Sequence, residues 1–400
     1  MVTHMTYTEM CTFETLYYAY LEARKGKRSK PGTAQYEANA LACTEKLSRK
    51  LAGGTYKPSG FEVFYVFEPK KRLVQAPAFV DKVVLHALTD NVLYDAICTS
   101  FIRDNHASQK GKGTLDGIVR LKEHMVDFYR KNGTADGWVL KCDVHHFFAS
   151  IDHDLLKSKL KVLFQKRQID MGFYELLCIY IDKSDGLPLG YQTSQLLALM
   201  FLDEFDHFIK ETRGFRYYGR YMDDFYIIAR TKKELQDLLV EVERWMGALN
   251  LELNSKTAIF PLRNGIDFLG FHSYLTETGS CVQKLRRSEI QRIRSRVKYW
   301  REAYPAGEVT KEAIITSFKG WDAFAAYGDT YALRQKYAEQ VSEIVGEKIK
   351  PRRKINSTQI ARTKRRVKQE RNIRRKRGEE PTRAGPALCS PRPDDIPPWM

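Results

Sequence analysis

The sequence predicts an α+β fold in which a small antiparallel sheet packs against helices. Short, apolar, strand-like segments at 138–144, 215–221 and 225–229 alternate with longer stretches of helical periodicity. The last two strands flank a short turn and are expected to pair as a hairpin. At 400 residues the chain can hold two or three packed units, and its hydrophobic share of 43% is ordinary for a globular protein.

The first part of the chain is predicted to be helical and to lead into a hairpin. Residues 7–52 carry apolar side chains at helical spacing, with a break at Pro31-Gly32. Residues 61–67 are strand-like, and residues 73–76 are the predicted partner strand. Two helices are then expected, at 78–97 and 114–131.

Further helices alternate with the strands of the sheet and follow it. We expect those that alternate with the strands to cover one face of the sheet. Beyond Pro351, Pro and Arg dominate and hydrophobic periodicity fades. The predicted helices are 153–165, 193–212 and 232–249 around the sheet, then 285–303 and 309–345.

The net charge of +17 indicates a polyanionic partner. Residues 351–378 alone hold thirteen Lys or Arg against one Glu. This stretch fits either a solvated disordered segment or an RNA-binding arm, and the two are compatible.

The sequence predicts a cytoplasmic protein with no membrane partner. No apolar run approaches the length of a membrane span, and no signal peptide is recognisable. The seven cysteines include no CxxC pair, so neither a disulfide framework nor a zinc site is expected.

Two adjacent carboxylates, Asp223 and Asp224, occupy the tip of the predicted hairpin. Like charges so close repel and raise one another's pKa, and a bound divalent cation would remove that cost. Asp also tolerates turn geometry, so the pair alone fits either a metal site or an ordinary turn.

A third carboxylate favours the metal interpretation. Asp143 stands near the end of the strand 138–144, where it fits either a metal ligand or a helix N-cap. Two strands that deliver three carboxylates to one point would suit the two-metal mechanism of polymerases. Mg²⁺ suits such a site because it takes one or two protein carboxylates together with phosphate oxygens and water.

Five blocks of sequence add a family resemblance. They are Leu140–His153, Gly186–Gln195, Tyr221–Asp224, Leu251–Thr257 and Phe268–Phe271. In order and spacing these blocks resemble the motifs of reverse transcriptases of the bacterial group II-intron-like branch. The resemblance extends from about Gly54 to about Leu333.

The resemblance implies a right-hand polymerase that copies RNA into DNA. Fingers would occupy residues 54–137, a palm with the antiparallel sheet 138–272, and a helical thumb 281–348. Residues 1–53 would form an N-terminal helical extension and residues 349–400 a basic, flexible tail. The expected partners are a template RNA, an RNA/DNA duplex and a small accessory protein.

The resemblance also implies a set of metal ligands and a proton donor. Asp143, Asp223, Asp224 and the backbone carbonyl of Val144 would hold two Mg²⁺, or Mn²⁺, beside a bound dNTP. Lys256 falls where the family often places a lysine that protonates the leaving pyrophosphate. An exposed lysine after a turn explains Lys256 equally well.

The resemblance implies five nucleotide-binding positions, which are Arg72, Phe148, Leu189, Gly190 and Gln195. Phe148 lies five residues after Asp143, where reverse transcriptases place a bulky residue that excludes a 2′-hydroxyl; otherwise Phe147 and Phe148 are both core aromatics. Arg72, at the hairpin turn, is the expected triphosphate ligand, ahead of Lys70 and Lys71.

The second block indicates a subtype. Most reverse transcriptases have Gln before Gly190 and Pro after Ser194, whereas this chain has Leu189 and Gln195. These departures match the enzymes of diversity-generating retroelements, which copy adenines with errors. An antiphage-defence or intron-like reverse transcriptase is the alternative, and a non-catalytic RNA-binding protein is the alternative from another class.

Two other basic segments receive different interpretations. Gln109–Thr114 looks like a phosphate loop but fails the Walker pattern, so no ATP site is assigned to it. In 285–301 the apolar residues face one way and the arginines lie elsewhere, which suits a thumb helix that grips phosphates or simply a soluble amphipathic helix. The apolar residues are Ile290, Ile293, Val297 and Trp300.

Overall fold

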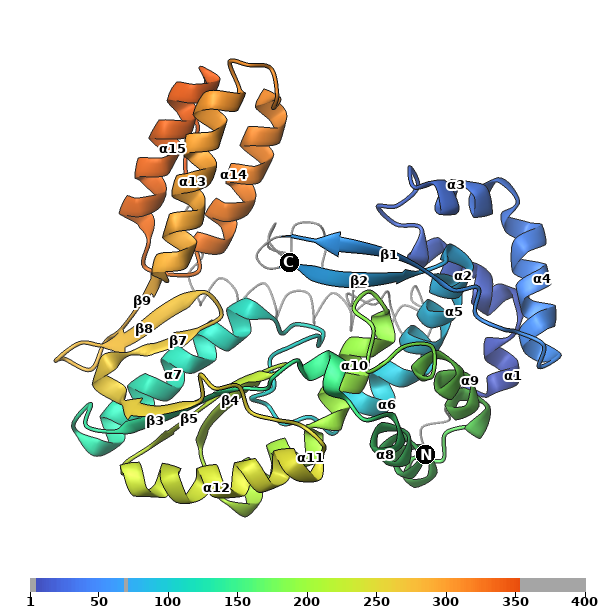
Figure 1. Ribbon diagram of the computed structural model, residues 1–400, viewed down its shortest axis with the longest axis horizontal. Coiled ribbons are helices and arrows are strands. Elements are labelled where there is room, and N and C mark those ends of the chain that lie inside the picture. The colour runs from blue at the N-terminus through green and yellow to red at the C-terminus, as the bar shows by residue number, and fades with distance from the viewer. Residues whose placement is uncertain (1–4, 68–70, 353–400) are drawn as a thin grey trace, which may run out of the picture.

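In the computed structural model, which describes residues 5–67 and 71–352, the chain is a mixture of helices and antiparallel sheets (Figure 1). The expected basic tail at 349–400 therefore lies outside the described residues from 353 onward. Among the described residues, no helix combines the length and the apolar character that crossing a bilayer requires.

The N-terminal helices confirm the prediction for residues 7–52. Tyr20, Tyr36 and Phe79 form their aromatic core, with ring centroids 5.2–6.3 Å apart. Pro31 begins a helix rather than interrupting one, because its fixed φ suits the first helical turn. The helices are α1 (Tyr7–Met10), α2 (Phe13–Ala23), α3 (Pro31–Ala38), α4 (Ala40–Ala52) and, after the next hairpin, α5 (Phe79–Leu88).

The predicted hairpin is present as β1 (Phe61–Val66) and β2 (Arg72–Pro77). The two strands pair antiparallel, with Val66 opposite Arg72. They form a sheet of their own, and most of β1 is exposed. The hairpin is therefore a projecting arm rather than part of the core.

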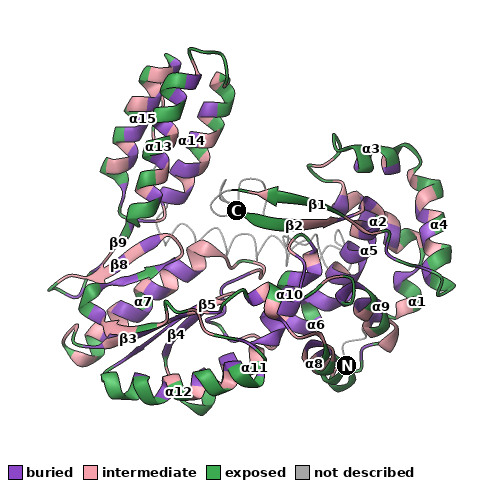
Figure 2. Ribbon diagram, in the orientation of Figure 1, coloured by how far each residue is buried: buried purple, intermediate pink, exposed green. Residues whose placement is uncertain are grey.

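A four-stranded antiparallel sheet lies at the centre of the chain, in the order β4-β5-β3-β6. Three of its strands confirm the prediction, and most of their residues are buried (Figure 2). The fourth, β6, was not predicted because it has only four residues. The strands are β3 (Trp138–Asp143), β4 (Tyr217–Tyr221), β5 (Asp224–Ala229) and β6 (Ala258–Pro261).

Both faces of this sheet are covered, so the expectation that helices cover one face is wrong. Leu140 and Ile227 join the core that includes α12 (Lys232–Ala248). Val139 and Ile228 point the other way, into a core shared with α7 (Thr114–Asn132). The physical reason is that consecutive residues of a strand face opposite sides, and here both sets are apolar.

Helices on the other side of the molecule pack into the same large core as α12. The helix predicted at 193–212 is divided at Leu202 and ends in a π-helical turn at Phe208–Thr212. The predicted helix at 78–97 is likewise interrupted by a π-helical turn, at Thr89–Leu93. The remaining members are α6 (Tyr94–Cys98), α8 (His153–Lys166), α9 (Met171–Ile181), α10 (Gln192–Phe201) and α11 (Asp203–His207).

The C-terminal part forms a third sheet and a three-helix bundle with its own core. The single helix predicted at 309–345 is wrong: it is two helices, because the chain turns at Gly328, where an added Cβ would lie 2.7 Å from the carbonyl of Gln283. The elements are β7 (Ile266–Phe268), β8 (Phe271–Leu275), β9 (Cys281–Leu285), α13 (Arg287–Ala303), α14 (Lys311–Ala325) and α15 (Tyr331–Val345).

Candidate active site

The hairpin turn between β4 and β5 has the backbone of a tight two-residue turn. Tyr221 pairs with Asp224, so Met222 and Asp223 are the two central residues. Met222 has φ 55°, a left-handed conformation that a non-glycine residue adopts only under constraint. The turn therefore presents Asp223 and Asp224 in a geometry that the surrounding structure must enforce.

The register of the sheet brings Asp143 to this turn. Asp143 is the register partner of Asp224, and the backbone N–H of Val144 donates to the carbonyl of Asp223 over 3.2 Å. Burial raises the pKa of Asp223, and the negative charge of Asp143 raises it further. The three aspartates thus come together at one end of β3 and β5.

A lysine that the sequence did not single out lies among these carboxylates. Lys141 is two residues before Asp143, on the same face of β3, and its ammonium forms an ion pair with Asp224. Burial lowers the pKa of Lys141 to about 8, although Asp143 and Asp223 act in the opposite direction. Its position could have been found from the period-two alternation of a strand.

The donor set fits a hard divalent cation, although the carboxylates are not arranged around one. Carboxylate and carbonyl oxygens from Asp143, Val144, Asp223 and Asp224 are the ligands that Mg²⁺ prefers. Within residues 5–67 and 71–352, no three His, Cys, Asp or Glu side chains are grouped so that they could hold a metal ion. The buried Oδ1 of Asp224 instead faces the Lys141 ammonium, so a positive charge already occupies part of the site.

The β1–β2 hairpin brings one cation toward the aspartates. Arg72 begins β2, and its positive charge acts to lower the pKa of Asp223. Lys71 lies elsewhere, with its Nζ 4.3 Å from the centroid of the Tyr65 ring. Lys70 lies outside the described residues.

A cavity of about 200 Å³ gathers four of the predicted nucleotide-binding positions. Phe148, Leu189, Gly190 and Gln195 all contribute to its wall. Lys27 from the N-terminal helical region and His86 from α5 also line it, and no sequence pattern marked either residue. The other lining residues are Pro188, Tyr191, Gln192 and Ser194.

The two neighbouring phenylalanines have different environments. Phe147 is 2% exposed and belongs to the core, whereas Phe148 is half-buried and lines the cavity. The left-handed φ of His146, 45°, directs the chain into the short 3₁₀ helix Phe147–Ser150, which carries both rings. Phe148 therefore packs partly against the core and partly lines the cavity, which fits both interpretations of this residue.

Gly190 allows the hairpin to lie against the cavity. The N–H of Gln75 on β2 donates to the carbonyl of Leu189 over 2.8 Å. Gly190 has φ 122°, and an added Cβ would lie 2.6 Å from the carbonyl oxygen of Gln75. One strand, β2, thus joins the cavity at Gln75 to the aspartates at Arg72.

Gln195 connects the cavity wall to the loop before α7. Its Oε1 accepts a hydrogen bond from the hydroxyl of Ser108 over 2.6 Å. In the same loop, Lys112 donates to the carbonyls of Arg103 and Asn105 at 3.1 and 2.8 Å. Burial lowers the pKa of Lys112 to about 8, and its ammonium ties together the backbone of this loop.

Lys256 lies in an exposed turn beside the end of β3. The N–H of Asn254, two residues earlier, donates to the carbonyl of Asp143 over 2.7 Å. The structure therefore places the Lys256 backbone near the aspartates and leaves its side chain in solvent.

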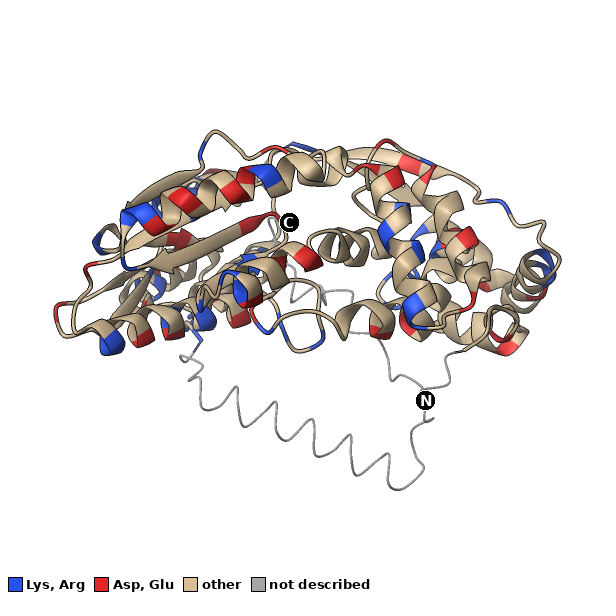
Figure 3. Cartoon of the chain, turned by 90° about the horizontal axis from the view of Figure 1, so that it is seen from below, with Lys and Arg blue, Asp and Glu red and all other residues tan. Residues whose placement is uncertain are grey.

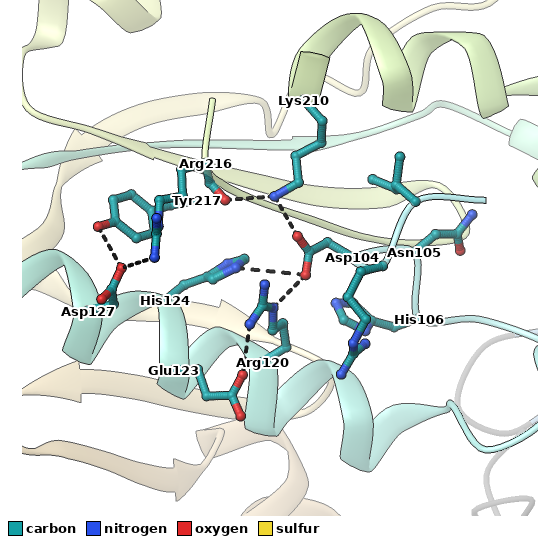
Figure 4. Close-up of polar contacts among 12 residues, drawn as sticks. Asp104, Asn105, His106, Arg120, Glu123, His124, Asp127, Lys210, Arg216 and Tyr217 are labelled. Carbon is teal, nitrogen blue, oxygen red and sulfur yellow. Dashed lines mark hydrogen bonds and ion pairs between the residues drawn. The ribbon is translucent and has the colours of Figure 1, made fainter. Parts of the chain in front are cut away.

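A buried polar network lies behind the sheet, between α7 and β4 (Figure 4). Asp104 accepts hydrogen bonds from Arg120 and pairs with Lys210, both over 2.5 Å. Burial alone would raise the pKa of Asp104, but these cations hold it at about 2. His124 donates to or accepts from Tyr226 over 3.0 Å, and burial lowers the pKa of His124 to about 3.

Comparison with known proteins gives one extensive family match. A family profile described as reverse transcriptase (RNA-dependent DNA polymerase) matches residues 62–273. Protein YkfC of Escherichia coli is 25% identical over 272 residues, which cover 56% of this chain and 69% of that protein. The putative COX1/OXI3 intron 2 protein of Saccharomyces cerevisiae is 23% identical over 218 residues, 48% of this chain and 23% of that protein.

Solved structures give more distant matches. A telomerase from Candida albicans, in complex with a fragment of telomeric RNA, has a TM-score of 0.45 and 12% identity; the match covers 72% of this chain and 60% of that one. An apo telomerase from Candida tropicalis has a TM-score of 0.45 and 10% identity over 72% of this chain and 57% of that one. This chain thus spans less than two thirds of either telomerase.

Proposed function

The chain belongs to the reverse transcriptase family of RNA-dependent DNA polymerases, with their right-hand fold, and we propose that it copies a template RNA into cDNA by two-metal nucleotidyl transfer. The observation that carries this proposal is the register of the sheet. It sets Asp143 against the turn that bears Asp223 and Asp224.

The aspartates and the carbonyl of Val144 would hold two Mg²⁺, or Mn²⁺. Bound there, the ions would activate the primer 3′-hydroxyl and neutralise the charge that develops on the pyrophosphate. Arg72 would bind the triphosphate from the opposite side, because its charge already acts at Asp223. Lys256 would reach the leaving group from its exposed turn and supply a proton.

The cavity would receive the sugar and base of the incoming dNTP. Its volume of about 200 Å³ is smaller than the usual 300–1,000 Å³ of a ligand site, so it suits part of a nucleotide. The aspartates and Arg72 do not line it, which leaves the triphosphate to extend along β2 toward them. Phe148 would then lie beside the sugar, where a 2′-hydroxyl would clash.

The C-terminal bundle would grip the product duplex as a thumb. On α13, Ile293, Val297 and Trp300 are buried, as the sequence predicted. Its exposed face carries Arg287, Arg294 and Lys298. Such a basic face suits phosphate contacts that do not depend on sequence. Acidic and basic positions are mixed along several helices of the chain (Figure 3).

Primer extension with Asp223→Ala tests the polymerase activity. We expect the extension rate to fall at least about 100-fold, because a metal ion held by Asp223 would contribute several kcal/mol of charge stabilisation in the transition state. Asp237→Ala is the matched control, since that aspartate lies on α12 with 59% of its side chain exposed. No extension above background by the wild type would instead favour a non-catalytic RNA-binding protein, and equal extension by wild type and Asp223→Ala would remove Asp223 from the metal site.

The subtype that we propose is the diversity-generating one. Leu189 presents an apolar side chain to the cavity, where most family members have Gln, and a looser set of polar contacts would weaken discrimination between nucleotides. A small accessory protein would be a partner of such an enzyme. Sequencing the products of an adenine-rich RNA template tests this, with any accessory protein present. Uniform accuracy at adenines would favour the intron-like or antiphage-defence alternative, and the similarity to the yeast intron protein supports the intron-like one.

A further inference from the structure

Directly behind the turn lies a buried ion pair that the mechanism above does not use. Arg220 on β4 and Asp206 on α11 are both 0% exposed. The guanidinium binds the carboxylate as a fork, from Nε to Oδ1 over 2.7 Å and from Nη2 to Oδ2 over 2.6 Å.

The same guanidinium also holds the turn itself. Its Nη1 donates to the carbonyl of Met222 over 2.9 Å, and its Nη2 donates to the carbonyl of Leu199 on α10 over 3.3 Å. Met222 is the residue with the left-handed φ, and its carbonyl belongs to the peptide that leads into Asp223. Arg220 thus connects the orientation of that peptide to two helices.

Asp206 is in turn fixed by contacts from other segments. It accepts a hydrogen bond from the hydroxyl of Tyr218 over 2.5 Å and one from Asn105 over 3.3 Å. The backbone of Arg220 lies in a ladder with residues 104–106: its N–H donates to Asp104, and its carbonyl accepts from His106, both over 2.9 Å. Figure 4 shows Asp104, Asn105 and His106 on this segment, next to α7.

Stability alone does not account for this pair. Well-packed apolar side chains of similar volume usually stabilise a core at least as well as a buried ion pair, because both charges lose their hydration. Unlike an apolar pair, the forked Arg220 guanidinium also fixes the direction of the Met222 carbonyl through a further N–H. We infer that Arg220 is a positioning residue: held by Asp206, it fixes the Met222 peptide and so sets Asp223 and Asp224 against Asp143. This inference rests on the proposed two-metal site.

Arg220→Lys tests the inference, because lysine keeps the charge but cannot form the fork and reach Met222 together. Arg334→Lys is the matched control. Arg334 is also a buried arginine, 1% exposed, and its Nη1 bonds Asp322 over 3.0 Å within the C-terminal bundle, in the core rather than on the basic face of α13. Asp206→Asn is the second variant, since it weakens the fork from the other side.

We expect Arg220→Lys to raise the Mg²⁺ concentration for half-maximal extension about tenfold and to lower kcat, as for residues that orient metal ligands. The Kd for primer–template should stay within about twofold. The affinity of the full chain for Mn²⁺, measured by the loss of the EPR signal of free Mn²⁺, should fall by the same factor. Arg334→Lys should lower the Tm and leave both metal responses unchanged.

The inference is overturned if Arg220→Lys and Asp206→Asn have the same half-maximal Mg²⁺ concentration and the same Mn²⁺ affinity as Arg334→Lys. If Arg220→Lys does not fold, Asp206→Asn decides by the same comparison. Failure of the wild type to extend any primer would refute the polymerase instead, and the Mn²⁺ measurement would still decide whether Arg220 positions the aspartates.

Discussion

Gly190→Ala separates the β1–β2 hairpin from the cavity with one methyl group. The new Cβ would lie 2.6 Å from the carbonyl oxygen of Gln75, and that atom is backbone, so it cannot rotate away. Alanine at φ 122° is strained as well. The loop and β2 must therefore move apart, and the Gln75–Leu189 hydrogen bond of 2.8 Å is lost.

The magnitude follows from these two changes. The strained φ costs about 1–3 kcal/mol and the lost hydrogen bond about 0.5–1.5 kcal/mol. If the hairpin moves to relieve the strain, Arg72 moves with Gln75 because both are on β2. The binding free energy of dNTP should then weaken by roughly 1.5–3 kcal/mol of the combined cost. Since about 1.4 kcal/mol is tenfold, kcat/KM for dNTP should fall roughly 10- to 100-fold, mostly through KM.

Single-nucleotide extension at varied dNTP concentration measures this effect. Gly133→Ala is the control, because Gly133 has φ 70° at the end of α7 and nothing lies within 4 Å of an added Cβ. It should lose about 1 kcal/mol of folding free energy and keep its KM. A KM for Gly190→Ala equal to that of Gly133→Ala would refute the connection between the hairpin and the nucleotide.

Three further predictions concern single side chains. Phe148→Ala should admit ribonucleotides, and unchanged rejection of ribonucleotides in competition assays would remove the gate. Lys141→Met should leave the carboxylates without their internal cation, so the Tm in EDTA should fall below that of the wild type. Added Mg²⁺ should then raise the Tm of the variant more than it raises the Tm of the wild type, and an equal rise in both would contradict this. His124 has a pKa of about 3 in the folded chain, against an ordinary value near 6.5. Between these two values only the unfolded chain binds a proton at His124. The free energy of unfolding should therefore fall by about 1.4 kcal/mol per pH unit as the pH drops from about 6 to 4. His124→Gln should flatten that slope in denaturant titrations, and an unchanged slope would assign it to other groups.

Much of the fold could be predicted because local signals agree with it. The helix at 114–131 ends at Gly133, whose left-handed φ closes it, and the hairpin at 61–76 has apolar strands around a charged turn. The helix α9 was missed because its apolar residues cover most of its circumference, which obscures the 3.6-residue period. The short strands β6 and β7 offer too few residues for any period to appear.

The site could be predicted less completely, for a physical reason. Aspartates in a family motif are visible in the sequence, but partners that meet only in the folded chain are not. The pairing of Arg220 with Asp206 joins a strand to a helix, and nothing local marks either residue as buried. The contribution of Lys27 to the cavity wall depends on how the N-terminal helices pack, which a sequence pattern does not fix.

The alternation that builds the core also decides where the carboxylates emerge. Val139 and Ile228 pack toward α7 as register partners, Lys141 and Tyr226 follow on the same face, and Asp143 and Asp224 end the series. A slip of β3 by one residue would place Cys142 opposite Asp224 and send Asp143 to the face that packs on α12. Burying that charge among the apolar side chains of α12 would be strongly unfavourable, so the packing that stabilises the sheet also selects the register in which the three aspartates meet.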